Sequence, residues 1–453
     1  MSEKKEWPWK DKFGDFPLVP VPPSMRKSST SIFYVYMGVL ACIAVLWGGG
    51  TLGTQFTLKE ALIVAVVGSA ILAVIGGLTS VIGAISRGST YMDMGFSFGW
   101  IGSKLFGTIT LGVAAGIGWY AVQVWLFGII MHTILPNLWW ANVGVAAIWG
   151  GLLMMITAII GINGIAWLSY LAVPFFLAIS GVGIMIGIAK GGGFGTLLSL
   201  KPATPASFGI GVTEVAGMYM VGAIICPDVA RFAKKASGAA IAWILQIMIF
   251  QIYYLFGAAA LTLATGATNV VGALVAGGIG LGAVMMAILG QWTTNDNNLY
   301  SGSLAFNTWV PIKRSYIVLA EGLIGTALAA WFGFKGGAGM QTFENFLTLL
   351  GKALPPVGGV LISDFYLYRW YKKEPLKQRY QFEPGMKFAQ VNWVGWVATI
   401  VGAILGGWVI KSGIPALNGF LIGAALYIVI AIICDKSHIR IEVGKHTINE
   451  MGE

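Results

Sequence analysis

The sequence predicts an all-α integral membrane protein, and three observations indicate this fold class. Of the 453 residues, 57% are hydrophobic and only 10% are charged, whereas soluble domains carry about 25% charged residues. The apolar residues gather in about twelve stretches, each long enough to cross roughly 30 Å of hydrocarbon as a helix. The basic residues fall mainly on alternate connections between these stretches, as they do in membrane proteins.

The apolar stretches define the predicted order of elements. Residues 1–31 form a polar N-terminal tail, which has four prolines between Pro17 and Pro23 and lacks the pattern of a cleaved leader. The predicted spans are 32–54, 60–86, 105–133, 139–162, 165–189, 208–226, 238–264, 273–304, 315–333, 340–368, 391–410 and 414–434. Residues 435–453 are predicted to form a second polar tail.

The distribution of charge predicts the orientation of the chain. Both tails and the even-numbered connections hold 22 of the 28 lysines and arginines, the odd-numbered connections hold 5, and Lys352 lies within a span. Because positive charge marks the cytoplasmic side, we expect both termini in the cytoplasm and a multi-pass protein of the inner (plasma) membrane. The net charge of +10 then indicates contact with anionic lipid headgroups and no nucleic-acid partner. The oligomeric state stays open.

Patterns of catalysis or metal binding are not recognised in the sequence. The three histidines lack the spacing of a metal site, and no nucleophile elbow, phosphate loop or dinucleotide motif stands in a suitable context. The cysteines lie far apart, which argues against a disulfide framework, and Cys42 is interpreted as a small packing residue. These features argue against an enzyme, an ATP-driven pump and an organic cofactor.

Glycine makes up 64 of the 453 residues and is concentrated in two spans. In the first span the cluster is Gly38 and Gly48–Gly50, and in the sixth it is Gly209, Gly211, Gly217 and Gly222. Close helix packing explains part of this enrichment. The two spans are five apart, however, and transporters with inverted five-helix repeats interrupt the first helix of each repeat to bind ion and substrate. The glycines permit such breaks.

The most informative segment is the polar run Gln291–Asn298, inside the otherwise apolar stretch Val270–Phe306. Hydrocarbon offers no partner for amides, hydroxyls or a carboxylate, so such groups face a bundle interior and commonly mark a substrate or ion path. Hydrogen bonding between packed helices is the alternative interpretation. One aspartate among three asparagines and two threonines exceeds what packing requires, and we therefore expect a binding site here.

The third span contains Trp119 and Gln123, which lie four residues apart and hence on one helix face. An indole plane can stack on a flat heterocycle, and a glutamine amide can pair with a neighbouring donor and acceptor on its edge. The alternative for Trp119 is a residue of the interfacial aromatic belt, although it lies near the middle of its span. Trp125 is interpreted as a packing residue.

In the sixth span, Tyr219 and Glu214 are candidate site residues. Tyr219 could close the far side of an aromatic sandwich around a planar ligand. A carboxylate in a membrane helix is costly, so Glu214 either binds an amino group or proton of the substrate, or pairs with a lysine at the extracellular mouth. Both interpretations of Glu214 stay open.

Several of these segments together resemble the nucleobase:cation symporter family, and in particular its bacterial cytosine permeases. They are Trp292–Asn297 followed by Leu299 and Tyr300, Pro355–Val360 with Asp364, and Trp47–Gly53. The resemblance runs from about Val21 to Ile430 and implies inverted repeats of the LeuT type, in residues 32–189 and 208–368, followed by two helices in 391–434. It also implies sodium-coupled uptake by alternating access.

Transferred residue by residue, the resemblance implies a Na⁺ site and a substrate site. The Na⁺ ligands would be the carbonyls of Gly38, Ala41 and Gly290 with the hydroxyls of Thr293 and Thr294. The substrate site would comprise Trp119, Gln123, Gly217, Met218, Tyr219 and the amides of Asn295, Asn297 and Asn298, with Asn295 favoured and Glu214 as an unusual addition. Gly116 stands where cytosine permeases have glutamine, Gln123 matches the hydantoin and allantoin branch, and Met218 and Val221 replace serines of the cytosine branch.

The expected function is import of a cytosine-like nucleobase or related planar N-heterocycle, coupled to Na⁺ or to H⁺. Hydroxymethylpyrimidine, a purine, allantoin or a hydantoin are alternative substrates within the same family. A channel or receptor without coupled transport is a different hypothesis and predicts uptake that is insensitive to a sodium gradient. A membrane enzyme ranks last because no nucleophile and base are paired in the sequence.

Overall fold

The computed structural model describes residues 11, 14–267, 269–276, 278, 280–310, 312–336, 340–383, 386–444 and 446–447. The outermost parts of both predicted tails, residues 1–10 and 448–453, lie outside the described residues. For residues 340–344, 446 and 447 only the backbone is described.

Helices make up most of the described chain. The α-helices are α1 (Ser29–Leu40), α2 (Ile43–Gln55), α3 (Leu58–Ser86), α4 (Thr90–Gly102), α5 (Tyr120–Ile134), α6 (Val143–Ile160), α7 (Ile162–Lys190), α8 (Gly193–Leu197), α9 (Phe208–Ile224), α10 (Pro227–Ala230), α11 (Ala236–Leu245), α12 (Ile252–Thr265), α13 (Val270–Ala276), α14 (Gly280–Phe306), α15 (Arg314–Phe334), α16 (Met340–Ala353), α17 (Pro355–Ile362), α18 (Arg369–Tyr371), α19 (Trp393–Ala403) and α20 (Pro415–Lys436). Short 3-10 helices are η1 (Pro23–Met25), η4 (Trp139–Ala141) and η7 (Leu376–Gln378). Segments of π-helix are η2 (Ser103–Gly112), η3 (Ala114–Trp119), η5 (Gln246–Gln251), η6 (Ser363–Tyr368) and η8 (Ile404–Val409).

Among the described residues, nine helices are long and apolar enough to cross a membrane, or up to ten if the bent pair α1 and α2 is one span. A count of twelve would also need α14, which carries the polar run, and the shorter apolar helix Trp393–Val409. Polar side chains lower the mean hydropathy of α14, yet they are buried and do not meet lipid. The number of spans therefore stays a prediction.

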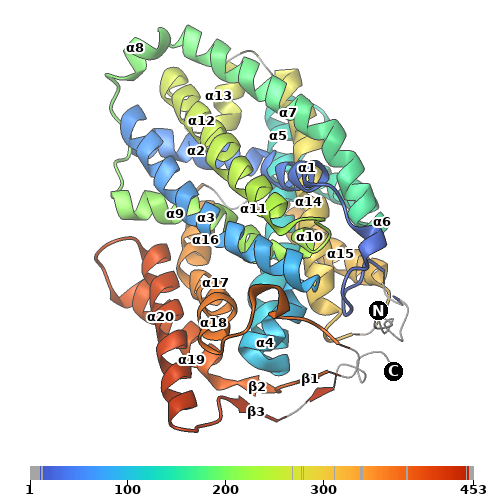
Figure 1. Cartoon of the computed structure of the whole chain (residues 1–453). Coiled ribbons are helices and arrows are strands. Elements are labelled where there is room, and N and C mark those ends of the chain that lie inside the picture. Colours follow the sequence, from blue (N-terminus) through green and yellow to red (C-terminus); the bar gives the residue numbers. More distant parts are fainter. Residues whose placement is uncertain are drawn as a thin grey trace.

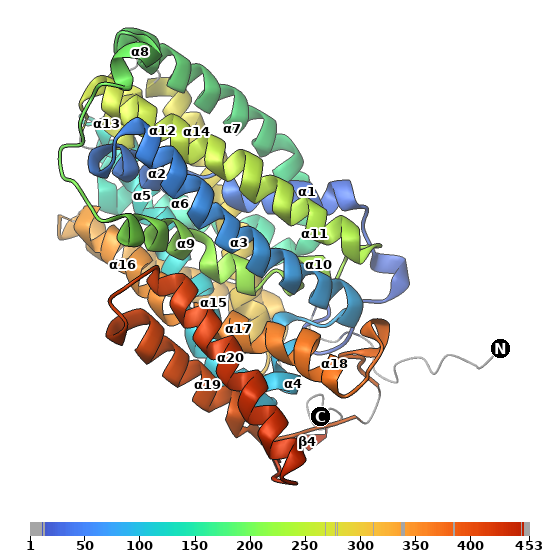
Figure 2. The same cartoon turned by 60° about the vertical axis from the view of Figure 1, so that its left-hand side comes forward.

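The helices of the bundle fall into two groups. Helices within a group contact one another more extensively than they contact helices of the other group. The first group is α2, α3, α9, α11 and α12, and the second is α5, α6, α14 and α15. Helix α7 contacts members of both groups. Helices α19 and α20 lie together on one edge of the bundle beside α17 (Figures 1 and 2). The surface where the two groups meet therefore runs through the middle of the bundle.

The first span is broken, as the glycine pattern permits. Helices α1 and α2 meet at an angle of 56°, and Ala41 and Cys42 between them have non-helical backbone angles. The backbone N–H of Ile43, which such a break leaves without an intrahelical partner, donates to the Gln291 side chain at 3.0 Å. In the sixth span, Tyr219 departs from helical geometry inside α9 (φ −130°, ψ 17°). The break between α1 and α2 lies next to α14, and Tyr219 lines the cavity described below.

Two segments outside the predicted spans contain regular secondary structure. Residues 90–102, which lie between two predicted spans, form α4, and this helix is almost entirely buried against the rest of the protein. The C-terminal tail, predicted from its polar composition, pairs with the connection before α19: β1 (Lys387–Phe388) with β4 (His446–Thr447), and β2 (Val391–Asn392) with β3 (Glu442–Val443), both antiparallel. Pairing between short segments far apart in the chain leaves no periodic pattern of hydrophobic residues, so the sequence alone could not predict it.

Gly49 shows how closely α2 packs on α12. A β-carbon at Gly49 would lie 2.5 Å from the Leu255 carbonyl oxygen and 2.8 Å from the Ala258 β-carbon. We expect Gly49→Ala to cost about 1–3 kcal/mol of stability, because overpacking forces the helices apart, and to lower the midpoint of thermal unfolding in detergent. The matched control is Gly195→Ala on α8, which has open space around it. Equal midpoints for the two variants would contradict this close packing.

Candidate functional site

A cavity of about 60 Å³ lies between the two helix groups, at the break of the first span. It is lined by Tyr36, Val39, Leu40, Cys42, Ala44, Val45, Trp119, Gln123, Met218, Tyr219, Val221, Gly222, Ile225, Cys226, Val229, Trp243, Thr294, Asn297, Asn298 and Ser301. The lining is mostly apolar and aromatic, with a few polar side chains from α5 and α14. Such a composition is typical of pockets for small organic ligands.

Two buried amides leave hydrogen-bonding capacity in this lining. The Gln123 side chain donates from Nε2 to the Cys42 sulfur at 3.4 Å, while its Oε1 has no hydrogen-bond partner among the described residues. The Asn297 side chain donates from Nδ2 to the Thr293 carbonyl at 3.0 Å, while its Oδ1 is likewise without a partner there. A buried acceptor that stays unpaired costs roughly 1–3 kcal/mol. Both oxygens therefore favour a ligand that brings N–H donors into the cavity.

Aromatic rings form further parts of the lining. Trp119 packs edge-on against Phe346, with ring centroids 5.3 Å apart. Tyr219 lies against Trp243 at 5.1 Å with an interplanar angle of 34°, and Tyr36 meets the same indole at 85°. The Trp243 indole N–H donates to the Leu72 carbonyl at 2.9 Å, which fixes this ring. The cavity is thus lined by packed aromatic side chains, which are the residue type on which planar molecules stack.

Oxygen atoms converge where α14 passes the break between α1 and α2. The Thr294 hydroxyl oxygen lies 3.4 Å from the Gly38 carbonyl oxygen and 3.0 Å from that of Gly290, and the Thr293 hydroxyl oxygen lies 3.0 Å from the latter. A β-carbon on Gly290 would lie 2.4 Å from the Ala41 carbonyl oxygen, so glycine is what lets the two backbones approach. Neutral hydroxyl and carbonyl oxygens suit a hard cation. The five residues predicted as Na⁺ ligands are thus gathered in one place.

Three of the predicted substrate-site residues do not line the cavity. Asn295, the favoured amide, lies behind the lining: its Oδ1 accepts from the lining residue Asn298 at 3.2 Å, and its Nδ2 is 3.2 Å from the Met154 sulfur and 3.5 Å from the Tyr120 carbonyl oxygen. Gly217 faces α16, since a β-carbon there would lie 2.0 Å from the Leu347 carbonyl oxygen. Glu214 is buried in α9, outside the lining. Trp119, Gln123, Met218, Tyr219, Asn297 and Asn298 do line it.

The positions that depart from the cytosine branch divide between the cavity and the packing around it. Met218 and Val221 line the cavity. Gly116 does not: a β-carbon there would lie 3.0 Å from the Glu321 carboxyl group and from Gly302. A glutamine at this position would therefore collide with α14 and α15 in the present arrangement. The buried Glu321 fills the space that the two glycines leave.

Other parts of the polar run serve packing or the break rather than the cavity. Asp296 accepts a hydrogen bond from the Thr157 hydroxyl at 2.5 Å, which in turn accepts from the Trp292 indole at 2.7 Å. Gln291 donates to the Gln123 backbone carbonyl at 3.0 Å, so it links the break to α5. Both contacts fit the alternative interpretation, in which small polar groups join packed helices.

Sequence reasoning missed several lining residues. Cys42, interpreted as a packing residue, contacts Gln123 and lines the cavity. Tyr36 and Ser301 also line it, and neither stood out in the sequence. For Ser301 a signal was present, because it lies seven residues after Thr294 and hence on the same helix face.

Comparisons with known proteins agree on one family. A family model described as permease for cytosine/purines, uracil, thiamine, allantoin matches residues 20–431. The cytosine permease of Escherichia coli strain K12 is 29% identical over 421 residues, which are 92% of this chain and 94% of that protein. The hydantoin permease of Microbacterium maritypicum is 25% identical over 403 residues, 83% of this chain and 79% of that protein.

Solved structures share the fold. A nucleobase-cation-symport-1 family transporter in a closed conformation with bromovinylhydantoin bound superposes with a TM-score of 0.76 at 18% identity, covering 92% of this chain and 95% of that one. A Na⁺-coupled sialic acid symporter in a substrate-bound outward-open state gives a TM-score of 0.64 at 14% identity, covering 94% and 93%. The predicted fold class, an all-α membrane transporter of LeuT type, is confirmed.

Proposed function

Because the chain belongs to the family of permeases for cytosine and purines, uracil, thiamine and allantoin, we propose that it imports a planar N-heterocycle by cation symport with alternating access. Membership makes it a transporter of nucleobase-like or hydantoin-like small molecules in a membrane, and not an enzyme. The proposal adds the cation, the direction of transport and the residues that carry them. We also propose that the protein spans the inner membrane with both termini in the cytoplasm.

The observation that carries the proposal is the pair of free acceptors beside aromatic faces. Gln123 Oε1 and Asn297 Oδ1 have no partner among the described residues, and both side chains line the cavity together with Trp119 and Tyr219. A heterocycle with N–H groups on its edge satisfies both oxygens while its ring lies against an aromatic face. Cytosine, uracil and hydantoins all present such an edge. A purely apolar ligand would leave the oxygens unpaired and is disfavoured.

Our candidate coupling ion is Na⁺, and the oxygens of Gly38, Ala41, Gly290, Thr293 and Thr294 are proposed to hold it. The fit rests mainly on Thr294, whose hydroxyl lies close to the carbonyl oxygens of Gly38 and Gly290. The backbone of Gly290 also approaches the Ala41 carbonyl, whereas the Thr293 hydroxyl contacts carbonyls of its own helix. A bound Na⁺ would supply electrostatic attraction between α1 and α14. Thr294 also lines the cavity, one turn from Asn297 and Asn298. Residues of the cation site and of the substrate site therefore share one helix face, and ordering one set pre-forms the other.

Coupling of this kind is reciprocal. If the cation tightens substrate binding by some factor, the substrate tightens cation binding by the same factor, typically worth about 1–3 kcal/mol. The competing hypothesis of an uncoupled facilitator predicts no such factor. Uptake into proteoliposomes, with and without an inward Na⁺ gradient, separates the two hypotheses, and a parallel pH gradient tests H⁺ as the coupling ion.

Binding of heterocycles to the purified protein is the direct test. We expect cytosine, hydroxymethylpyrimidine, allantoin, hydantoin, uracil or adenine to quench tryptophan fluorescence saturably, more tightly with Na⁺ present. Trp119→Phe and Trp243→Phe should each reduce this quenching, because both tryptophans line the cavity, whereas Trp139→Phe, at an exposed tryptophan outside it, should not. Absence of saturable binding for all six compounds would contradict the proposed substrate class and leave the fold standing.

A further inference from the structure

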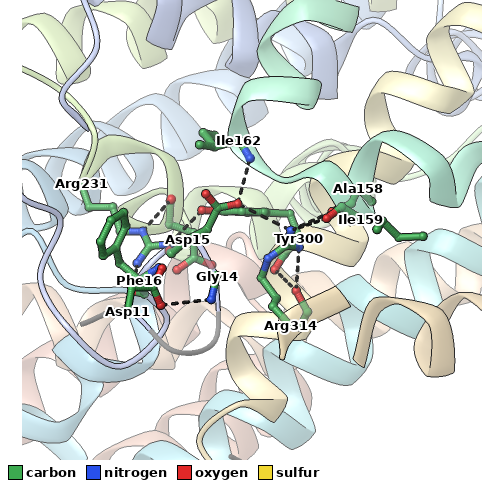
Figure 3. A network of polar contacts seen from close by, with 12 residues as sticks. Asp11, Gly14, Asp15, Phe16, Ala158, Ile159, Ile162, Arg231, Tyr300 and Arg314 are labelled. Atoms are coloured by element: carbon green, nitrogen blue, oxygen red, sulfur yellow. Dashed lines mark hydrogen bonds and ion pairs between the residues drawn. The ribbon is translucent and has the colours of Figure 1, made fainter. Parts of the chain in front are cut away.

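Arg231 is a fully buried arginine whose guanidinium donates hydrogen bonds to the N-terminal segment of the chain (Figure 3). Its guanidinium donates from Nη1 to the Phe16 carbonyl and from Nη2 to the Asp15 carbonyl at 2.7 Å. The same Nη2 donates to the Tyr300 hydroxyl of α14 at 2.8 Å. A buried guanidinium is costly unless its donors are satisfied. Arg231 thus depends on the backbone of residues 15 and 16.

The Asp15 side chain makes a second anchor on different helices. Its carboxylate accepts from the backbone N–H of Ile162 at 3.0 Å and lies 3.5 Å from the Arg314 guanidinium of α15. Helix α7 begins after Gly161, which has no side chain to cap it, and a β-carbon at Gly161 would lie 1.8 Å from the Asp15 carboxylate. The positive φ of 92° at Gly161 opens this space. Asp15 therefore caps α7 from outside the helix.

The segment is held along its length. The Asp11 carboxylate accepts from the backbone N–H groups of Gly14 and Phe16, both at 3.0 Å, which shapes the turn. Ser89 donates to the Pro17 carbonyl at 3.0 Å, and Leu18 is buried. We call Gly14–Leu18 the N-terminal strap. A free polar tail would make none of these contacts.

The strap ties together the two helix groups at one end of the cavity. Arg231 directly follows α10, which packs on α3 of the first group, whereas Tyr300 and Arg314 belong to α14 and α15 of the second. The neighbours of these anchors reach the cavity, since Ser301 follows Tyr300 and Val229 lies two residues before Arg231. Separating the groups at this end would expose the cavity and would also break the strap contacts.

We infer that the N-terminal strap is a latch that keeps the cavity closed on its own side, predicted to be cytoplasmic, and that its release accompanies substrate exit. The inference rests on the proposed function, because a transporter must open the cavity to that side. Arg231 and Asp15 act as positioning residues, since neither lines the cavity. A cleft lined by Gly14, Asp15, Lys313, Arg314 and Ser315 leaves the Asp15–Arg314 pair within reach of water. Water can therefore compete for it when the strap lifts.

The native cysteines provide the test. Cys226 lines the cavity near Val229, and Cys434 lies in α20 away from it. In inside-out membrane vesicles without substrate, we expect Asp15→Ala to accelerate modification of Cys226 by a membrane-impermeant maleimide about fivefold or more, measured by peptide mass spectrometry. Loss of two hydrogen-bonded or ion-pair contacts of a partly buried carboxylate is sufficient for such a shift in the open population. The rate at Cys434 should stay unchanged.

Asp435→Ala is the matched control. It breaks the Lys372–Asp435 pair, 2.8 Å long, which joins the end of α20 to the residue after α18 and does not link the two groups. We expect wild-type rates at Cys226 in this variant. Asp15→Asn, which keeps the shape and an acceptor for Ile162, should give a smaller acceleration and keeps the test decisive if Asp15→Ala folds poorly.

Equal Cys226 rates in wild type, Asp15→Ala and Asp15→Asn would overturn the latch, even if heterocycles bind. Failure of every heterocycle to bind, combined with faster modification in the Asp15 variants, would overturn the proposed substrate class and keep the latch. The two inferences therefore fail separately. An equal acceleration in Asp435→Ala would also count against the latch, because it would show that loss of an ion pair that does not link the two groups also opens the cavity.

Discussion

Replacing Gln123 with leucine is expected to weaken heterocycle binding by about 10- to 100-fold. Gln123 is 1% exposed, and its Oε1 is one of the two free acceptors in the cavity. Leucine has a similar volume and removes the amide, so a buried N–H of the ligand is left unpaired, at a cost of about 1–3 kcal/mol. Isothermal titration calorimetry of the purified variant, with the best heterocycle and saturating Na⁺, measures the loss.

Gln251→Leu is the matched control for this experiment. Gln251 is also a buried glutamine without partners among the described residues, but it does not line the cavity. The same chemical change there should leave affinity within about twofold and should not destabilise the protein, because it removes an unsatisfied polar group. Unchanged affinity in Gln123→Leu would mean that the ligand takes no hydrogen bond from this side chain.

Replacing Thr294 with valine is expected to abolish the effect of Na⁺ on substrate affinity. The Thr294 hydroxyl lies 2.9–3.4 Å from the carbonyl oxygens of Val39, Gly290 and Gly38, so it joins α14 to the broken first span. Valine keeps the shape and removes the oxygen. The ratio of dissociation constants without and with Na⁺, expected between about 5 and 150 for the wild type, should fall to about one. Thr293→Val should act in the same direction.

The control for the threonine variants is Thr399→Val. Thr399 is a buried threonine of α19 whose hydroxyl has no partner among the described residues, and it lies outside the cavity. In Thr399→Val, the effect of Na⁺ on substrate affinity should equal that in the wild type. If both Thr293→Val and Thr294→Val keep the full sodium effect, these hydroxyls do not hold the coupling ion. Sodium-insensitive wild-type protein would instead favour H⁺ or uncoupled transport.

Hydrophobic patterning and glycine content predicted much of this architecture. The class of protein, the polar run in α14 and the face shared by Trp119 and Gln123 follow from side-chain polarity and helical periodicity, which are local properties. The glycines of the first span permitted a break, and the structure has one at Ala41 and Cys42. Local patterns could not reveal that residues 90–102 form a helix or that the C-terminal tail pairs with 387–392, since those elements depend on distant partners.

The polar run Gln291–Asn298 illustrates which features follow from the sequence and which depend on tertiary packing. With eight consecutive residues of mixed polarity, every face of that part of α14 carries a polar side chain, and the sequence by itself determined only that a site lies on this helix. Packing against α1, α5 and α6 decided the rotation of α14, which turns Thr294, Asn297, Asn298 and Ser301 to the cavity at helical spacing and Asn295 away from it. The strap has the same origin. Residues 14–18 belong to the predicted N-terminal tail, and only the folded chain brings the carbonyls of Asp15 and Phe16 to a buried arginine more than two hundred residues later. A buried guanidinium is costly unless its donors are satisfied, and these carbonyls accept from it.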